Sequence, residues 1–163
     1  MSKRIWINIS LLFLVISLSA NIFFLENETE QKILPLTSIR AESINKIEIH
    51  RDNSDDIIFI RKDDVWFMEA PLQLKANVAR IESILKILKT QSYNKFNISD
   101  VDAAEFELKN PTVILKLNEN KIYFGTSNPV TQKRYVSFDN MIHITDDFLY
   151  PQLKLNASFF TKK

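Results

Sequence analysis

The chain has 163 residues, of which 45% are hydrophobic and 25% charged, proportions that are typical of a folded protein with one globular domain. Its 21 basic residues nearly balance its 20 acidic ones, which argues against nucleic-acid binding, because phosphate neutralisation requires a basic excess. The absence of cysteine excludes disulfides, thiolate metal sites and cysteine nucleophiles, and the single glycine, Gly125, excludes phosphate-binding glycine loops.

An uncharged, mostly apolar run covers residues 5–25 and follows Lys3 and Arg4. As a helix it would be roughly 31 Å long, about the thickness of the hydrocarbon core of a bilayer. A cleaved signal peptide is the alternative, but the apolar run continues beyond the small residues at which cleavage would occur. We therefore predict that residues 1–25 are a transmembrane anchor or uncleaved signal in the inner (cytoplasmic) membrane. The positive-inside rule places the N-terminus in the cytoplasm and the rest in the periplasm or outside.

After the anchor, polar residues 26–42 predict a tether, and residues 43–163 an extracytoplasmic α+β domain. The domain opens with three short apolar segments separated by polar turns, which is the pattern of an antiparallel meander. The predicted strands are 44–49, 57–61 and 65–68. Because glycine is so rare, we expect Asn and Asp to occupy the left-handed turn positions.

The most strongly patterned element is a helix over residues 78–90. Asn77 is a favourable N-cap, and the apolar residues at 78, 81, 84, 85 and 88 lie on one helical stripe. A shorter helix is predicted from Ser99, with Asp100 and Asp102 in its first turn, to about Phe106.

A second sheet portion follows Pro111, with strands predicted at 113–117, 122–124, 135–138 and 141–145. The stretches 44–68 and 113–138 share the pattern strand, polar turn, strand, loop, strand, which suggests an internal duplication. A helical turn near 146–149 and an amphipathic tail to Phe160 end the chain. The predicted class is α+β: an antiparallel sheet of two meander units packed by one long and one short helix, after a single N-terminal transmembrane helix.

The order of several landmarks resembles a bacterial family known as domain of unknown function 4340, over roughly residues 44–160. The landmarks are Trp66, Pro71, Ala76-Asn77, Phe106-Glu107-Leu108, Pro111, Phe124-Gly125, Pro129 and Arg134-Tyr135-Val136. The resemblance implies a single-span protein with an extracytoplasmic α+β domain, in some genomes near ABC-type transport or gliding genes, and implies no catalytic residues. Many relatives have glycine where Glu107 stands, which leaves open the geometry of the chain at that position.

The polar candidates for catalysis or metal binding have simpler interpretations. His50 and His143 lie opposite the apolar positions of their strands, so both are predicted on a solvated face. The acidic pairs at 55–56, 63–64 and 146–147 sit at turns or at a helix start, which turn chemistry explains better than a glycosidase site. We therefore predict no catalytic residue, no metal site and no cofactor, with a hydrolase of unrecognised type as a minor alternative.

Aromatic residues near the C-terminus are more numerous than one short tail can bury. Phe148, Tyr150, Phe159 and Phe160 are therefore predicted as a possible partner-binding patch. The favoured function is a non-enzymatic, membrane-anchored interaction or accessory module with a protein partner in the envelope, and an envelope or ABC-type transport system is the association that we expect. The alternative is a periplasmic domain that binds a small ligand or glycan.

Overall fold

The computed structural model describes residues 5–6, 8, 11–14 and 34–161, and the chain divides into two units, 1–32 and 33–163. Most of the predicted membrane segment 5–25 and the predicted tether residues 26–33 lie outside the described residues. Within the part that is described, no helix is long and apolar enough to cross a membrane.

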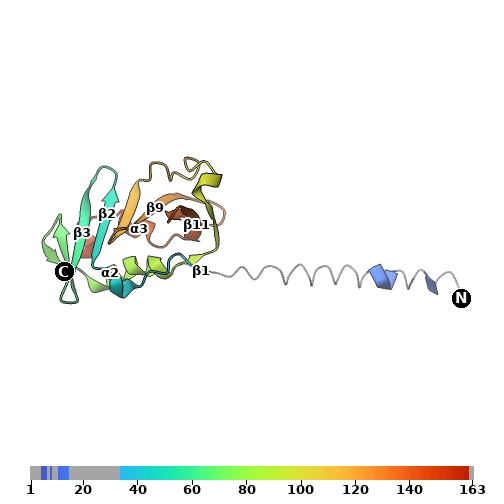
Figure 1. Cartoon of the computed structure of the whole chain (residues 1–163), viewed down its shortest axis with the longest axis horizontal. Coiled ribbons are helices and arrows are strands. Elements are labelled where there is room, and N and C mark those ends of the chain that lie inside the picture. Colours follow the sequence, from blue (N-terminus) through green and yellow to red (C-terminus); the bar gives the residue numbers. More distant parts are fainter. Residues whose placement is uncertain (1–4, 7, 9–10, 15–33, 162–163) are drawn as a thin grey trace. The chain divides into compact units, whose positions relative to one another are not determined.

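The second unit is built on one nine-stranded antiparallel sheet, which confirms the α+β class (Figure 1). Its strand order is β5-β4-β3-β2-β8-β9-β10-β11-β7, so two meanders join through their first strands, β2 and β8. The first meander consists of β2 (Lys46–Arg51), β3 (Ser54–Lys62), β4 (Val65–Ala70) and β5 (Leu74–Lys75). The second consists of β8 (Val113–Leu117), β9 (Asn120–Ser127), β10 (Lys133–Phe138) and β11 (Met141–Asp146), with β7 (Asn94–Asn97) at its edge.

The hairpin turns use the residues that the low glycine content predicts. Eight described non-glycine residues have positive φ, and six of them are Asn or Asp: Asn53, Asp63, Asp64, Asn118, Asp139 and Asn140. The Asp63-Asp64 and Asp139-Asn140 pairs have positive φ at both positions, the requirement of the two-residue hairpin turn that matches strand twist. Asn and Asp therefore take the place of glycine in these turns.

The long helix forms as predicted, in two parts: α2 (Val78–Leu85) and the 3₁₀ segment η2 (Lys86–Lys89). The Asn77 side chain caps it by accepting a hydrogen bond from the Ala79 amide at 3.1 Å. The helix predicted from Ser99 to Phe106 is wrong, because only η3 (Ile98–Asp100) is helical. Asp102 instead nucleates a turn: its carboxylate accepts from the Ala104 amide and its carbonyl from the Glu105 amide.

The main core lies on one face of the sheet, under α2, η2, α3 (Tyr150–Leu153) and η4 (Ala157–Phe160). Alternate strand residues point into it and are almost fully buried: Ile47, Ile49, Ile57, Phe59, Trp66, Met68, Val113, Leu115, Leu117, Ile122, Phe124 and Val136. The helices contribute Ile81, Ile84, Ile87, Leu88, Leu153 and Phe160. We call this the core face of the sheet and the opposite side its outer face.

The chain enters the domain through residues 34–42, which we call the strap. Its β1 (Leu34–Pro35) pairs with β6 (Gln91–Ser92), Leu36 is buried, and the strap then runs beside η2 before η1 (Ala41–Ser43), along the lower side of the sheet in Figure 1. The domain therefore begins earlier than the expected boundary at residue 43. Sequence reasoning assigned these residues to a tether because they are mostly polar and contain a proline.

Candidate interaction surface

The outer face of the second meander is covered by the chain itself. Residues 103–108, which we call the cover segment, place the Phe106 ring 4.6 Å from that of Tyr135 and 5.8 Å from that of Phe96, centroid to centroid. Beneath them Ile142 is fully buried, and Leu108 is 6% exposed. The outer face of this meander is therefore buried around Gly125, Ser137 and Ile142.

Gly125 makes this close coverage possible. A Cβ atom added there would lie 2.2 Å from the Phe106 carbonyl oxygen and 2.9 Å from Leu108 Cγ. The Thr126 amide donates to the same Phe106 carbonyl at 2.8 Å, which ties the cover segment to β9. The only glycine of the chain thus serves close backbone approach, without a positive φ.

Strand register relates the two meanders residue by residue. Ile57 pairs with Ile49 of β2, and Ile122 pairs with Leu115 of β8, so the core residues Phe59 and Phe124 occupy equivalent positions. Ile60 is then the counterpart of Gly125. Met68 pairs with Phe59 as Val136 pairs with Phe124, so Phe67 and Tyr135 are the residues that precede these equivalent pairs. The pairing of β9 with β10 shifts register at Tyr135, whereas Phe67 pairs with Ile60.

No described segment covers the outer face of the first meander. We call its exposed and half-exposed apolar side chains the bare face: Ile58, Ile60, Val65 and Phe67. Phe67 is 37% exposed and lies directly across from Ile60. Whereas Tyr135 is covered by Phe106, Phe67 faces solvent.

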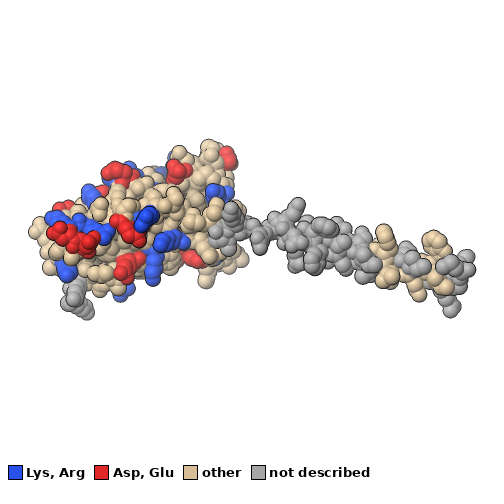
Figure 2. Space-filling view, turned by 60° about the horizontal axis from the view of Figure 1, so that its bottom comes forward, with Lys and Arg blue, Asp and Glu red and all other residues tan. Residues whose placement is uncertain are grey.

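A hollow of about 350 Å³ opens beside the bare face. Ile60, Phe67 and Leu74 provide its apolar lining, and Lys62 and Glu69 bring one charge of each sign. The charge pattern is mixed elsewhere as well: in the view of Figure 2, basic and acidic side chains are interspersed rather than gathered into a patch of one sign. The surface is thus apolar at its centre with balanced charges around it, which is the anatomy of a protein interface.

A charged row continues along the outer face from the bare face towards the second meander. Glu48 lies between Lys46 and Lys116, with nitrogen–oxygen distances of 3.2 and 3.3 Å. Burial alone would raise the pKa of Glu48, but the neighbouring ammonium groups of Lys46 and Lys116 outweigh it and lower the pKa. Glu48 therefore stays ionised, and the row separates the bare face from the second meander.

The predicted aromatic patch is largely internal. Phe160 is fully buried, with its ring 5.8 Å from that of Phe59, so it cannot contact a partner. Phe148, Tyr150 and Phe159 are half-buried and pack against the core, and Arg80 stacks on Phe159 at 3.9 Å. The aromatic side chains of the C-terminal residues are more buried than the sequence predicted, because η4 packs over β3.

The prediction that His143 is solvated is wrong: it is 6% exposed. It lies across from Val136 and shares the core face with it. The alternation of apolar and polar residues in β11 gave the wrong prediction because both faces of the strand are buried. His143 lies on one face and Ile142 on the other. His50 is half-exposed as expected, and its Nδ1 lies 2.7 Å from a carboxylate oxygen of Asp56.

His143 Nδ1 lies 2.9 Å from the Ser92 hydroxyl, the one contact that resembles part of a catalytic dyad. Ser92 is 8% exposed, and no carboxylate of the described chain hydrogen-bonds to His143. The pair is therefore enclosed and lacks the acidic group that orients histidine in a catalytic triad. Among the residues that the structure describes, no three His, Asp or Glu side chains come together as metal ligands.

The second meander also contains an ion pair, between a buried arginine and a half-buried aspartate, that sequence reasoning missed. Arg134 donates to both carboxylate oxygens of Asp147, at 2.7 and 2.8 Å, and to the Gly125 carbonyl. Its guanidinium lies 3.5 Å from the centre of the Tyr150 ring. The landmarks Phe106, Gly125, Arg134 and Tyr135 thus meet in one structural cluster around the cover segment.

The fold defines an α+β protein whose landmark residues hold a cover segment on one half of a continuous antiparallel sheet. The chain belongs to the family described as domain of unknown function (DUF4340), whose model matches residues 66–163. The expected resemblance over residues 44–160 is thereby confirmed from Trp66 onward. No curated protein and no solved structure matches the chain.

Proposed function

We propose that this protein is a non-enzymatic interaction module, anchored in the inner membrane by residues 5–25, whose extracytoplasmic domain binds another envelope protein through the bare face. The uncharged leading run and the basic residues before it support the anchor and its orientation. An ABC-type transport component is one such partner, suggested by the family resemblance.

The observation that carries the proposal is the contrast between the two outer faces. In the second meander, the Phe106 ring of the cover segment packs against the half-exposed Tyr135, and Leu108 and Ile142 are buried. In the first meander Phe67 is 37% exposed and Ile60 is half-exposed, and no segment among the described residues stacks an aromatic ring on them. Because a chain segment with apolar side chains covers the outer face of the second meander, we expect a protein segment of the same kind to bind the first. Lys62 and Glu69 beside the bare face favour a partner that has both basic and acidic residues at the edge of its binding surface.

Site-specific photocrosslinking in cells tests the interface. We expect a photoreactive phenylalanine analogue at position 67 to give one discrete adduct with a membrane or envelope protein. Val130, which is 88% exposed at the tip of the β9–β10 loop, is the matched control position and should give no such adduct. The substitution Phe67→Ser should abolish co-purification of the same protein. Absence of an adduct at position 67, or the same adduct from both positions, would contradict the proposal.

The anchor and its orientation require a separate test, and the cysteine-free chain is convenient for it. The single-cysteine variant Asp52→Cys, in the β2–β3 turn, should react with a membrane-impermeant maleimide in cells whose cytoplasmic membrane is intact. A variant with cysteine at Ser2 should react only after lysis. Labelling in the opposite order, or recovery of the chain with an intact N-terminus in the soluble fraction, would refute the assigned location.

A further inference from the structure

The apolar side chains of the bare face lie on only two neighbouring strands, β3 and β4. Strand register places Ile60 across from Phe67, and Val65 across from Lys62. Ile58 lies two residues before Ile60 on β3 and therefore points to the same side of the sheet. Neighbouring strands are about 5 Å apart and a helix with its side chains is about 10 Å across, so one helix can cover both strands.

Charged residues border the bare face on both of its long sides. On the β2 side, Lys46 and Glu48 pair with the strand positions of the bare face. On the β5 side, Lys75 lies across from Phe67. A second sheet packed on this face would extend over several strands and bury these charges. The narrow apolar area therefore fits a single helix better than it fits a sheet.

An extended segment like the cover segment does not fit the bare face either. At Gly125 the absence of a side chain lets the Phe106 carbonyl approach β9 and accept the Thr126 amide. Ile60 fills the equivalent space with its side chain, so the backbone of an occupant must lie one side-chain layer further out. An extended backbone held there over apolar groups would leave its N–H and C=O groups without partners. A helix pairs these groups within itself.

The lysines at the border favour acidic side chains on the occupant. Lys46 already forms an ion pair with Glu48. Lys62 and Lys75 are exposed, and within residues 34–161 neither has an acidic partner within 4 Å. Acidic residues on the flanks of an occupant would therefore pair with these two lysines. The uncharged run 5–25 of this chain has no such residues, so the charge pattern favours a segment of another protein.

We propose that the bare face binds one amphipathic helix of the envelope partner, whose acidic flanks pair with Lys62 and Lys75. One apolar side chain of the helix fills the hollow of about 350 Å³ that Ile60, Phe67 and Leu74 line. The first meander then has helices on both faces of its sheet, because the core face is already covered by helices. The inference rests on the proposed function, since it uses the same face, and adds the secondary structure and charge of the partner segment.

Mapping crosslinks to single residues, with the full-length chain in cells, tests the helix. The photoreactive phenylalanine analogue is placed in separate variants at positions 58, 60, 65 and 67, and mass spectrometry identifies the partner residues that react. Positions 58 and 60 are roughly 7 Å apart, a distance that a helix spans in about four residues and an extended strand in two. We expect the reacting residues to lie in one segment at intervals of three or four.

The remaining outcomes separate this inference from the proposed function. Intervals of two, or reacting residues in separate segments, would overturn the helix and leave the binding of a partner at the bare face intact. Failure of all four positions to crosslink any protein would refute both. A crosslink only to lipid, or only to residues 5–25 of the same chain, would assign the bare face another occupant and would also refute both.

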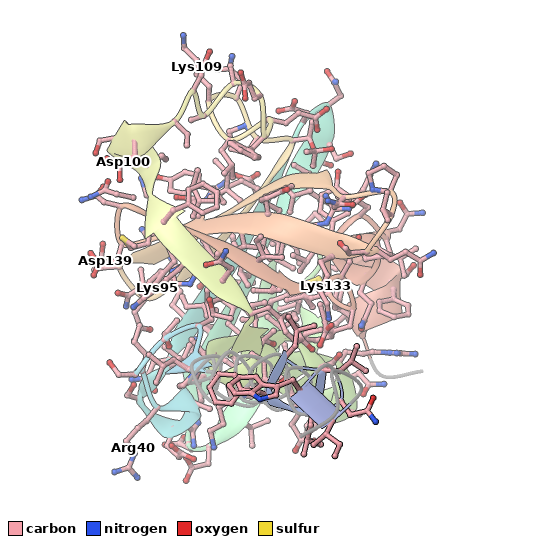
Figure 3. The ribbon with its side chains drawn as sticks, turned by 90° about the vertical axis from the view of Figure 1, so that its right-hand side faces the viewer. Arg40, Lys95, Asp100, Lys109, Lys133 and Asp139 are labelled. Atoms are coloured by element: carbon pink, nitrogen blue, oxygen red, sulfur yellow. The ribbon has the colours of Figure 1, made fainter. Side chains whose placement is uncertain are left out.

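Charge reversal tests the flanks of the helix. The double variant Lys62→Glu and Lys75→Glu should lower the yield of the position-67 adduct about fivefold, because each exposed ion pair contributes modestly and reversal adds repulsion. Lys109→Glu is the matched control and should leave the yield unchanged. Lys109 directly follows the cover segment, and Figure 3 shows its side chain pointing outward from the domain. An unchanged yield in the double variant, or an equal loss in the control, would overturn the acidic flanks and this choice of occupant.

Discussion

The two meanders have the same strand order, and Phe59–Met68 corresponds to Phe124–Val136, but their register irregularities and their outer faces differ. In the second, Gly125 leaves room for the cover segment, which packs on the outer face beside Ile142 and Tyr135. In the first, the equivalent position carries Ile60, whose side chain occupies the space that a close backbone would need. One position therefore accounts for much of the difference between a covered face and a face that remains available to another molecule.

The core faces differ as well. Trp66 precedes Phe67 and Arg134 precedes Tyr135, and the side chains of Trp66 and Arg134 are almost buried. The first meander fills this place with an apolar ring, while the second uses a guanidinium that requires Asp147 as its partner. The second meander is therefore expected to depend on polar contacts that the first does not have.

The largest expected effect comes from breaking the Arg134–Asp147 ion pair of the second meander. Asp147→Asn leaves the Arg134 guanidinium enclosed beside a neutral amide, and we expect the free energy of unfolding to fall by about 3 kcal/mol. Asp64→Asn in the first meander is the matched control, because Asp64 is exposed in its pair with Arg61 and Asn tolerates the left-handed turn position. It should change stability by no more than about 0.5 kcal/mol. Urea unfolding measures both, and similar losses would refute the contrast.

The next prediction exchanges the residues that distinguish the two outer faces. Gly125→Ala forces the cover segment away from β9 and should cost about 2 kcal/mol, through overpacking and the weakened hydrogen bond from Thr126 to Phe106. Ile60→Ala removes a half-exposed side chain from the bare face and should cost about 1 kcal/mol or less. The aromatic near-ultraviolet circular dichroism should change only for Gly125→Ala, because Phe106 loses its contact with Tyr135. Equal costs and unchanged spectra for both variants would contradict this account.

Much of the fold could be predicted from the sequence because most of its elements have one buried face. Alternation predicted β2, β3 and β8, and the apolar stripe with Asn77 predicted α2. Alternation failed in β11, where neighbouring residues His143 and Ile142 are both buried and nothing in the pattern indicates which face is solvated.

The short pairings could not be predicted, because strands of two residues carry no periodicity. The strap and its partner β6 depend on contacts between residues far apart in sequence, such as Thr37 with Leu88. The cover segment is irregular, and its position follows from Gly125 and the Phe106 carbonyl rather than from local propensity. The bare face could not be predicted either. In the sequence, Phe67 is simply a strand residue on the solvent side, and only the comparison with Tyr135, which Phe106 contacts in the structure, distinguishes it.

The smallest expected effect concerns the cover segment itself. Glu107 has a φ of 57°, a left-handed conformation that costs a non-glycine residue about 1 kcal/mol. Glu107→Gly should therefore raise the free energy of unfolding by about 0.5 kcal/mol, the relieved strain exceeding the entropy that glycine adds to the unfolded chain. Glu105 lies in the same segment without a positive φ, so Glu105→Gly should lower stability by about 0.5–1 kcal/mol.

Opposite signs at two positions two residues apart would show that the backbone conformation at position 107 determines the effect of glycine there, and that this chain forms a left-handed turn without glycine. Destabilisation by both variants would mean that the Glu107 side chain contributes more than its strain costs. The cover segment would then be held by its side chains as well as by its backbone. The contrast with the bare face would be larger, because no described segment makes such side-chain contacts with Phe67 and Ile60.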